Sequence, residues 1–471
     1  MTLYQQLANS LKKQIEEGFY ANGQKLPSIR SMSHEREVSI STVQECYRSL
    51  EDSGYVSSKY KSGYYVVYKG QSYPRPDLSQ PVQEPVTVEN WQEALNLTLT
   101  QTDDKFLALG GGGPNTHFST LRPLQKILNR QLRMHTQAAY KPAKGNGLFA
   151  LRAQIARQMQ DSGCYVHPDE LLITTGCQEA LSLCLRVLTQ PSDIVAIDSP
   201  SFYGSMQAVS SNQLKVLEIP THPEKGISLP ALELALEQWP IKVLQLIPTT
   251  NNPLGYVMPE ENKRKLLQLA DRYDLAIIED DIVGDLSYHT PRPASLKSMD
   301  KQGRVLMCSS FSKTLAQGLR IGWVAPGRYA SKLTHMKFVT SMGSTTLPQM
   351  AIAEFIAEGH HAKHLHHARL HYHNSRDQVL RWIARDFPQG CKATFPQGGY
   401  WLWVEMPREL DSFELNRQLN GFGIGVAPGG LFSAANKYRH CFRLNFAQLD
   451  ERVEQAIGVI GEQIELLMKL A

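Results

Sequence analysis

The hydrophobic positions of the first 68 residues predict three helices followed by two strands. The first helix has an apolar residue every four positions, at Leu3, Leu7, Leu11 and Ile15. This spacing is typical of an amphipathic helix, which Gly18 would end. A second helix is expected after Pro27–Ser28, in the segment LPSIRSMSHERE.

A third helix and a β-hairpin complete this segment. Ser39 or Ser41 can cap the helix, and Gly54 can end it. The inward face consists of Val43, Tyr47 and Leu50. The segment YVSSKYKSGYYVV then alternates as a strand, turns near Lys61–Gly63 and alternates again. Three helices and a hairpin in this order predict a winged helix-turn-helix in residues 1–68.

Residues 69–104 differ from their surroundings in composition. The stretch KGQSYPRPDLSQPVQEPVTVEN carries four prolines and no periodic apolar face. Proline restricts φ and lacks a backbone donor, so we expect a semi-extended linker. The next domain should begin near residues 102–106.

From residue 105 onward, short apolar runs alternate with segments of helix length. Six runs are bounded by turn residues: LLITTG, IVAID, VLQLIP, LAIIED, VLMCSS and GWVAP. Such runs are typical of a mostly parallel sheet that is covered on both faces. A second α/β pattern surrounds GGYWLWVEMP and HCFRLNFA. We therefore expect an α/β fold with a large domain over 105–330 and a small domain over 331–471.

Composition narrows the range of partners. The formal net charge of the 471 residues is only +4, so contact with nucleic acid requires a local basic patch. No stretch approaches about 20 apolar residues, and no export signal is visible, which argues against a membrane partner. The seven cysteines are scattered without C-x-x-C spacing. This favours reduced thiols in the cytoplasm, without a disulfide framework or a metal site.

The carboxyl ends of the predicted strands carry complementary chemical groups, and ligands of α/β sheets bind at such ends. Gly176 precedes the free N–H groups of a helix start, which form a phosphate cradle together with Ser310 and Arg320. Phe202 or Tyr203 could stack on a flat ligand. The group is completed by Cys177, Gln178, the amide of Asn252, the carboxylates of EDD at 279–281, and Lys313. A lysine that can form a Schiff base, together with these groups, is the set of residues that pyridoxal 5′-phosphate requires.

Two known families resemble the two halves of the chain. Residues 105–471 resemble the fold-type I aminotransferases, and residues 1–68 resemble the GntR-family winged helix-turn-helix. Their fusion in this order resembles the MocR-type regulators. The resemblance implies that Lys313 is the aldimine lysine and that Asp280 is the partner of the pyridine nitrogen. It also places Asn252 at the cofactor 3′-oxygen and Phe202 at the ring-stacking position.

Further roles follow from the same resemblance. The phosphate site corresponds to Gly176, Cys177, Gln178, Ser310 and Arg320. The segment YKPAKGNGLFALR is similar to one whose tyrosine, here Tyr140, reaches the phosphate of the neighbouring subunit. Arg443 in FRLNFA matches the arginine that holds a substrate carboxylate as a bidentate pair.

One position departs from the aminotransferase pattern. The family usually has a tyrosine three residues after the pyridine aspartate, and this chain has Val283 there. The phenol that donates to the 3′-oxygen is therefore missing unless Tyr256 or another group replaces it. Cofactor binding should persist through Lys313 and the phosphate site, whereas efficient catalysis should not.

Structural interpretations of these residues remain open at this point. Lys313 could be a solvated helix residue and Asp280 a capping carboxylate. Phe202 could belong to the core, and Arg443 could form an ordinary ion pair. The agreement of five strand ends favours the cofactor interpretation for the group as a whole.

The predicted helix-turn-helix offers a set of DNA contacts. Arg30 resembles a DNA-contacting arginine of the GntR family, and Gln44 could pair with adenine. Hydroxyls at the start of the recognition helix can reach phosphates, and wing lysines can contact the DNA backbone. These residues are Ser39, Ser41 and Thr42 on the helix and Lys59 and Lys61 on the wing. Ile40 departs from the basic or polar residue of relatives, and a helical dimerisation module is the alternative interpretation.

A histidine-rich segment, GHHAKHLHHARLHYHN, raises the question of a metal site. His360, His364, His367 and His371 follow helical spacing, and histidines four residues apart can bind metal. No carboxylate or cysteine completes the set, and the resembled family has a solvent-facing helix there. We expect affinity for metal resins rather than a specific site.

Two functions remain. The leading prediction is a cytoplasmic, DNA-binding transcription regulator that senses an amino acid or amine through an aldimine at Lys313. The alternative is an active aminotransferase with an accessory DNA-binding module. In both cases the resemblance implies a homodimer, with head domains that swap onto the partner bodies. An intact winged helix and the missing tyrosine at Val283 favour the regulator.

Overall fold

The computed structural model describes residues 2–16, 20, 23–59, 62–67, 73–89, 91–100, 106–143 and 145–470. The chain divides into two compact units. The first, which we call the head, comprises Met1–Pro74 with Tyr288–Pro291. The second, which we call the body, comprises Arg75–Ser287 and Arg292–Ala471.

The head contains three helices and an antiparallel hairpin, as predicted. The elements are α1 (Leu3–Glu16), α2 (Ile29–Glu35), α3 (Ile40–Asp52), β1 (Val56–Lys59) and β2 (Gly63–Val66). Leu7, Leu11 and Ile15 are buried, whereas Leu3 is 55% exposed. The core therefore uses only part of the predicted apolar face.

Local signals set the ends of the head helices. Ser39, and not Ser41, caps α3, because its hydroxyl accepts a hydrogen bond from the Thr42 backbone N–H at 3.1 Å. Ser28 caps α2 in the same way through Ser31. The positive φ of 72° at Gly54 lets the chain leave α3 toward β1.

The body is built on an eight-stranded sheet with the order β4-β11-β10-β9-β8-β5-β6-β7. Its strands are β4 (Leu172–Thr174), β5 (Ile194–Ser199), β6 (Lys215–His222), β7 (Gly226–Ile227), β8 (Ile241–Leu246), β9 (Ala276–Asp280), β10 (Val305–Ser310) and β11 (Gly322–Ala325). The neighbours from β10 through β9, β8 and β5 to β6 are parallel, and β11 is antiparallel to both of its neighbours. All six predicted runs form strands, and β6 and β7 extend the sheet at one edge.

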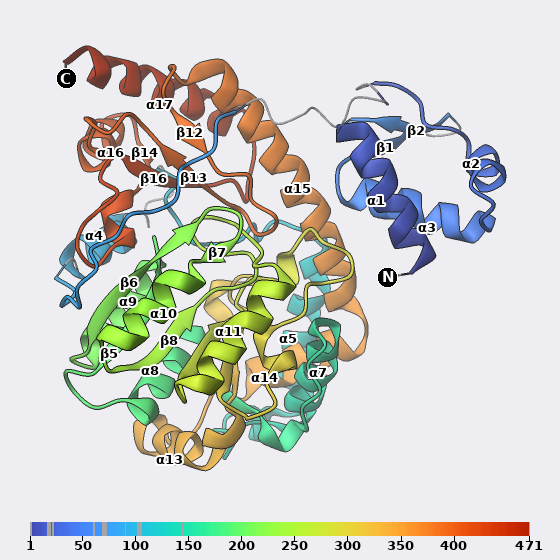
Figure 1. Ribbon diagram of the computed structural model, residues 1–471. Helices are drawn as coiled ribbons and strands as arrows, with labels where there is room; N and C mark the ends of the chain where they lie inside the picture. Colours follow the sequence, from blue (N-terminus) through green and yellow to red (C-terminus); the bar gives the residue numbers. More distant parts are fainter. Residues whose placement is uncertain are drawn as a thin grey trace. The chain divides into compact units, whose positions relative to one another are not determined.

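Helices cover both faces of this sheet because successive strand residues point to opposite sides. One face packs against α10 (Leu229–Gln238), α11 (Glu260–Arg272) and α12 (Leu296–Met299), and the other against α8 (Cys177–Leu188), α9 (Tyr203–Ser211) and α13 (Ala330–Ser341). Leu244 and Ile277 belong to the first core, and Val243 and Ile278 to the second. In Figure 1, α10 and α11 lie together over one side of the sheet.

The remaining helices and a smaller sheet complete the body. The helices are α5 (Arg122–Met134), α6 (Thr136–Ala139), α7 (Phe149–Met159), α14 (Leu347–Ala357), α15 (His360–Asp386), α16 (Ser412–Asn420) and α17 (Glu451–Leu470). The antiparallel sheet has the order β12 (Lys392–Ala393), β13 (Trp401–Glu405), β16 (Cys441–Asn445) and β15 (Ala427–Pro428). A separate parallel pair joins β3 (Leu107–Ala108) to β14 (Ile424–Gly425). Among the described residues, no helix is long and apolar enough to cross a membrane.

The proline-rich segment is only partly the linker that the sequence predicts. Residues 75–89, which we call the strap, form no helix, yet they hydrogen-bond to β6. Val86 and Val216 exchange two backbone hydrogen bonds of 2.8 Å, and Thr221 donates to the Ser79 hydroxyl at 2.7 Å. A helix that the sequence did not predict, α4 (Trp91–Thr100), follows the strap.

Candidate functional site

Lys313 lies in the turn that follows β10. Its side chain is half-buried, and its amine end is enclosed and donates to the Gly112 carbonyl at 2.6 Å. Burial, reinforced by the positive charge of Arg443, lowers the pKa of Lys313 to about 8. The amine is therefore unprotonated far more often near neutral pH than a solvated lysine, which suits a nucleophile. This position contradicts the interpretation of Lys313 as a solvated helix residue.

Asp280 ends β9, the parallel neighbour of β10. Its carboxylate is buried and accepts hydrogen bonds from the Ile282 backbone at 3.1 Å and from the Cys177 thiol at 3.5 Å. Burial raises the pKa of Asp280 to about 6, although both hydrogen bonds and the positive charge of Lys313 oppose the rise. A cationic partner in the same cavity would hold this carboxylate in its charged form.

The start of α8 forms a cradle near the end of β10. Gly176 caps the helix with a φ of 79°, and a Cβ there would lie 2.6 Å from the Arg320 guanidinium. Only glycine allows this approach of the arginine to the helix start. The hydroxyl of Ser310 accepts from the Ser312 backbone at 3.3 Å, and the buried Ser312 hydroxyl has no hydrogen-bond partner among the described residues. Free helix N–H groups, an arginine and spare hydroxyl capacity could bind a phosphate.

Gln178 and Phe202 meet at the start of α9. The Gln178 amide donates to the Gly204 carbonyl at 2.7 Å, and a Cβ on Gly204 would lie 2.4 Å from the Phe202 ring. The rings of Phe202 and Tyr203 have centroids 4.8 Å apart. Phe202 is half-buried rather than part of the core, so one of its sides is available to a ligand.

Arg443 in β16 is fully buried. Its guanidinium donates to the Asn252 side chain at 2.8 Å and to the Gly110 carbonyl at 2.7 Å. Its Nε has no hydrogen-bond partner among the described residues, and the Phe432 ring centroid lies 5.0 Å away. Within that part of the chain its hydrogen bonds go to neutral groups, which disfavours the ordinary ion pair and leaves a buried cation able to receive a carboxylate.

A run of four glycines, which is not among the residues predicted from the sequence, lines the same region. Lys313 and Arg443 donate to carbonyls of Gly110–Gly113, and Asn445 donates to two further carbonyls of that run at 2.9 Å. A Cβ on Gly112 would lie 3.0 Å from the Lys313 amine. The signal was visible as LGGGGP, because consecutive glycines allow a backbone to approach charged side chains closely.

The histidine-rich helix α15 is partly buried, whereas the family resemblance implies a solvent-facing helix there. His361, His364 and His373 are buried, and the ring of Phe118 packs against several of the histidines. Hydrogen bonds of 2.7 Å join His364 to the Thr314 carbonyl and to the Thr120 hydroxyl. Since a carbonyl only accepts, His364 donates from Nε2 and accepts at Nδ1. The ring thereby supports the turn that carries Lys313.

Tyr140 and the position of the missing tyrosine, Val283, differ in exposure. Tyr140 is 74% exposed beside the end of α6, and its contact with a neighbouring subunit stays a prediction. Val283 is fully buried. The hydroxyl of Tyr256 donates to Asp198 at 3.0 Å, so Tyr256 uses its proton in the core rather than replacing the missing phenol.

The predicted DNA contacts lie on the surface of the head. Arg30, Ser39, Ser41, Gln44 and Lys59 are exposed. The hydroxyls of Ser41 and Thr42 each lie 2.8 Å from that of Ser39, which forms a polar cluster at the start of α3. The Lys59 amine lies 4.5 Å from the Tyr65 ring centroid. Lys61 lies outside the described residues, and Ile40 is 50% exposed beside the cluster.

The fold and the groups around Lys313 define the body as an aminotransferase-like α/β protein, and the head as a helix-turn-helix module. The chain belongs to the class I and II aminotransferase family, whose profile matches residues 109–460, and residues 3–66 match the gntR family of bacterial regulatory proteins. This combination is consistent with a MocR-type regulator.

Some relatives match the whole chain, whereas others match about four fifths of it. The HTH-type transcriptional regulator YjiR of Escherichia coli K12 is 45% identical over 100% of both chains, and YdcR of the same strain is 33% identical over 99% of both. The aromatic-amino-acid aminotransferase 1 of Thermococcus litoralis is 29% identical and covers 79% of this chain and 91% of its own. Similarity to regulators over the full length favours the regulator over an aminotransferase with an accessory module.

Solved structures match the body. LysN, an α-aminoadipate aminotransferase from Thermus thermophilus complexed with N-(5′-phosphopyridoxyl)-L-leucine, is 29% identical with a TM-score of 0.74. It covers 81% of this chain and 100% of its own. The multiple substrate aminotransferase of Thermococcus profundus is 27% identical with a TM-score of 0.73, over 80% and 96% of the two chains.

Proposed function

We propose that the body of this regulator holds pyridoxal 5′-phosphate and senses an amino acid or amine, and that the head transmits the signal to operator DNA. In this proposal residues 1–68 bind DNA, residues 69–104 connect, and residues 105–330 and 331–471 form the two parts of the sensor. The observation that carries the proposal is the enclosed amine of Lys313 with its lowered pKa, beside the buried carboxylate of Asp280.

The residues present fit this cofactor. The phosphate would be held by N–H groups and side chains of Gly176, Cys177, Gln178, Ser310 and Arg320, and the unpartnered Ser312 hydroxyl supports an oxygen-rich ligand there. Asp280 would pair with the ring nitrogen, Asn252 would face the ring oxygen, and Phe202 would stack. When bound, pyridoxal 5′-phosphate supplies an aldehyde that captures amines and a ring that withdraws electrons.

The effector class follows from Arg443. A buried guanidinium that forms hydrogen bonds only to neutral groups among the described residues favours an anionic ligand. A carboxylate could take the free Nε and exchange with the Asn252 amide as a bidentate partner. The effector is therefore an amino acid, or an amine that carries an acidic group.

Assembly is a further part of the proposal. Exposed apolar side chains gather near the antiparallel bridge between Ala143 and Ser344. They are Met134, Tyr140, Phe338, Val339 and Met342. A second copy of the chain would cover them and bring Tyr140 to its phosphate site. We propose a cytoplasmic homodimer with exchanged heads, which binds two operator half-sites.

The test is to add pyridoxal 5′-phosphate to the full-length protein, reduce it with borohydride and map the modified peptide by mass spectrometry. We expect the added mass on Lys313, no labelling in Lys313→Ala, and normal labelling in Lys332→Ala, which alters an exposed lysine of α13. Labelling of surface lysines alone would contradict the proposal. Sustained transamination at ordinary rates of about 1–10³ s⁻¹ would instead establish the enzyme alternative.

A further inference from the structure

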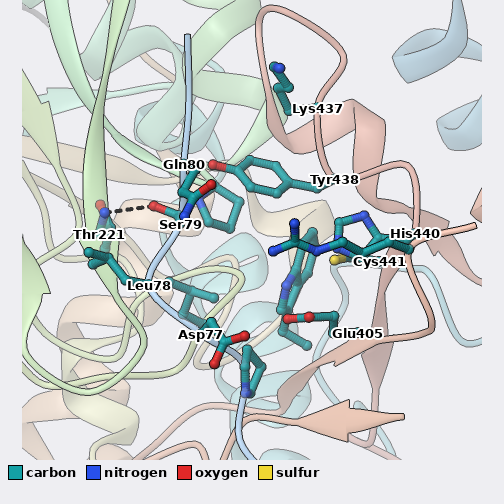
Figure 2. A pocket seen from close by; sticks show the side chains of 15 residues that line it. Asp77, Leu78, Ser79, Gln80, Thr221, Glu405, Lys437, Tyr438, His440 and Cys441 are labelled. Atoms are coloured by element: carbon teal, nitrogen blue, oxygen red, sulfur yellow. Dashed lines mark hydrogen bonds between the residues drawn. The ribbon is translucent and has the colours of Figure 1, made fainter. Parts of the chain in front are cut away.

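A cavity of about 300 Å³ lies where the strap crosses the small antiparallel sheet (Figure 2). It shares no lining residue with the group around Lys313. Residues 76–80 of the strap form one side. Glu405 and Cys441 of the small sheet, with His440 beside them, form another, and the three side chains converge in Figure 2.

The sheet register brings Glu405 and Cys441 together, and His440 of the preceding turn lies close to both. Glu405 at the end of β13 pairs directly with Cys441 at the start of β16, so their side chains point to the same face. His440 lies in the turn that precedes Cys441, and its carbonyl accepts from the Met406 backbone at 2.9 Å. The carboxylate oxygen, ring nitrogen and sulfur all lie within 4.8 Å of one another.

We propose that Glu405, His440 and Cys441 bind a Zn²⁺ ion, with a fourth coordination position open to the cavity. Carboxylate, imidazole and thiolate are the ligands of this ion, and three protein ligands plus water are the usual set of an open zinc site. Bond lengths of about 2.0–2.3 Å require the donor atoms to lie closer together than 4.8 Å. Side-chain rotation of the half-exposed Glu405 and His440 supplies this movement.

Zinc binding needs Cys441 as a thiolate and His440 as a neutral ring, so the bound metal displaces the thiol proton to solvent as the sulfur–zinc bond forms. The thiolate and the Glu405 carboxylate then balance the two charges of Zn²⁺. Arg408 and Lys437 also line the cavity, so the negative ligands have to outweigh nearby positive charge.

A neighbouring lysine links the site to the strap. The Lys392 amine lies 2.7 Å from the Asp77 carboxylate of the strap and 3.5 Å from the Glu405 carboxylate. When Glu405 binds Zn²⁺, its carboxylate no longer interacts with Lys392. Of these two contacts, the lysine then keeps only its ion pair with Asp77. The metal site is thus coupled to the ion pair that joins the strap to the small antiparallel sheet.

Titration of the full-length protein with Co²⁺ tests the proposal, because a cysteine ligand produces a thiolate-to-cobalt absorption band that histidine ligands do not. We expect the band to saturate at one Co²⁺ per chain, to disappear on addition of Zn²⁺ and to be lost in Cys441→Ser. The matched control is Cys164→Ser, which alters a buried thiol in a different hydrophobic cluster. A second control, His366→Ala with His367→Ala, removes exposed histidines of α15 and should keep the band.

Two further variants keep the test decisive if Cys441→Ser fails to fold by circular dichroism. Glu405→Gln and His440→Gln alter half-buried side chains, and each should weaken Co²⁺ affinity at least about tenfold. Absence of the band in the unaltered protein, its survival in a folded Cys441→Ser, or unchanged affinity in both other variants would overturn the proposal.

Discussion

The head and the body place their functional residues in opposite environments. In the head, Arg30 and Gln44 are exposed and lie within one short stretch of sequence. In the body, Asp280 and Arg443 are buried and come from strands far apart in the chain. A DNA-facing surface needs only a rigid scaffold beneath it, whereas chemistry on a small ligand needs water excluded and pKa values shifted. Substitutions of functional residues in the head should therefore change DNA binding with little effect on stability. In the body, substitutions of functional residues should change both ligand binding and stability.

The largest expected effect is on the core of the head. Tyr47 is fully buried, and its hydroxyl donates to the Pro27 carbonyl at 2.8 Å. Tyr47→Ala leaves a cavity and an unpaired carbonyl, so we expect the head to lose about 3–5 kcal/mol of stability. Hydrogen exchange should show faster exchange in the head alone, and Gln44→Ala on the same helix is the control. Equal loss of protection in the body would contradict the independence of the two cores.

The next effect concerns the response of the body to acid. Burial lowers the pKa of His361 from 6.5 to about 4. The unfolded chain thus binds this proton at a higher pH than the folded chain does, and acid favours unfolding. Relative to His361→Gln, the unaltered protein should lose roughly 3 kcal/mol of stability between about pH 7 and about pH 4. Urea unfolding across this range measures the difference, and parallel profiles for both proteins would show that His361 does not titrate in this way.

The smallest effects should appear on the exposed face of the head. Gln44→Ala should reduce discrimination at one base pair by about 1–3 kcal/mol, and Arg30→Ala should weaken operator binding. Neither should change thermal stability by more than about 0.5 kcal/mol, because neither side chain is packed. Binding titrations with single-base operator variants test both statements. A large loss of stability in either variant would mean that this face is structural.

Structural features that depend on residues close together in the chain can be predicted from the sequence. Apolar runs locate six strands of the large sheet, and Ser39 is predictable as a cap of α3 because capping depends on nearby residues. The functional strand ends were also predictable, since parallel strands bring their carboxyl ends to one edge. Side-chain partners distant along the chain were not. The bond from His364 to the Thr314 carbonyl spans fifty residues, and no periodic pattern encodes it.

Distance along the chain also explains why the role of Gly110–Gly113 and the pairing of the strap were not predicted. The role of Gly110–Gly113 depends on Arg443, which lies more than three hundred residues later. The strap is fixed by its pairing with β6, which its prolines do not reveal. The proline-rich composition predicts a semi-extended segment and gives no sign of α4, which follows the strap. Features set by nearby residues can thus be predicted from the sequence. Contacts between residues distant along the chain become visible only in the folded structure.

The most direct test of the account measures operator affinity of the full-length protein with and without each of a panel of amino acids and amines. We predict that at least one compound changes the affinity in the unaltered protein and in Lys332→Ala, and that none does so in Lys313→Ala. This result would connect ligand capture at Lys313 in the body to DNA binding by the head. An undiminished response in a folded Lys313→Ala would contradict the central claim that this lysine is the sensor.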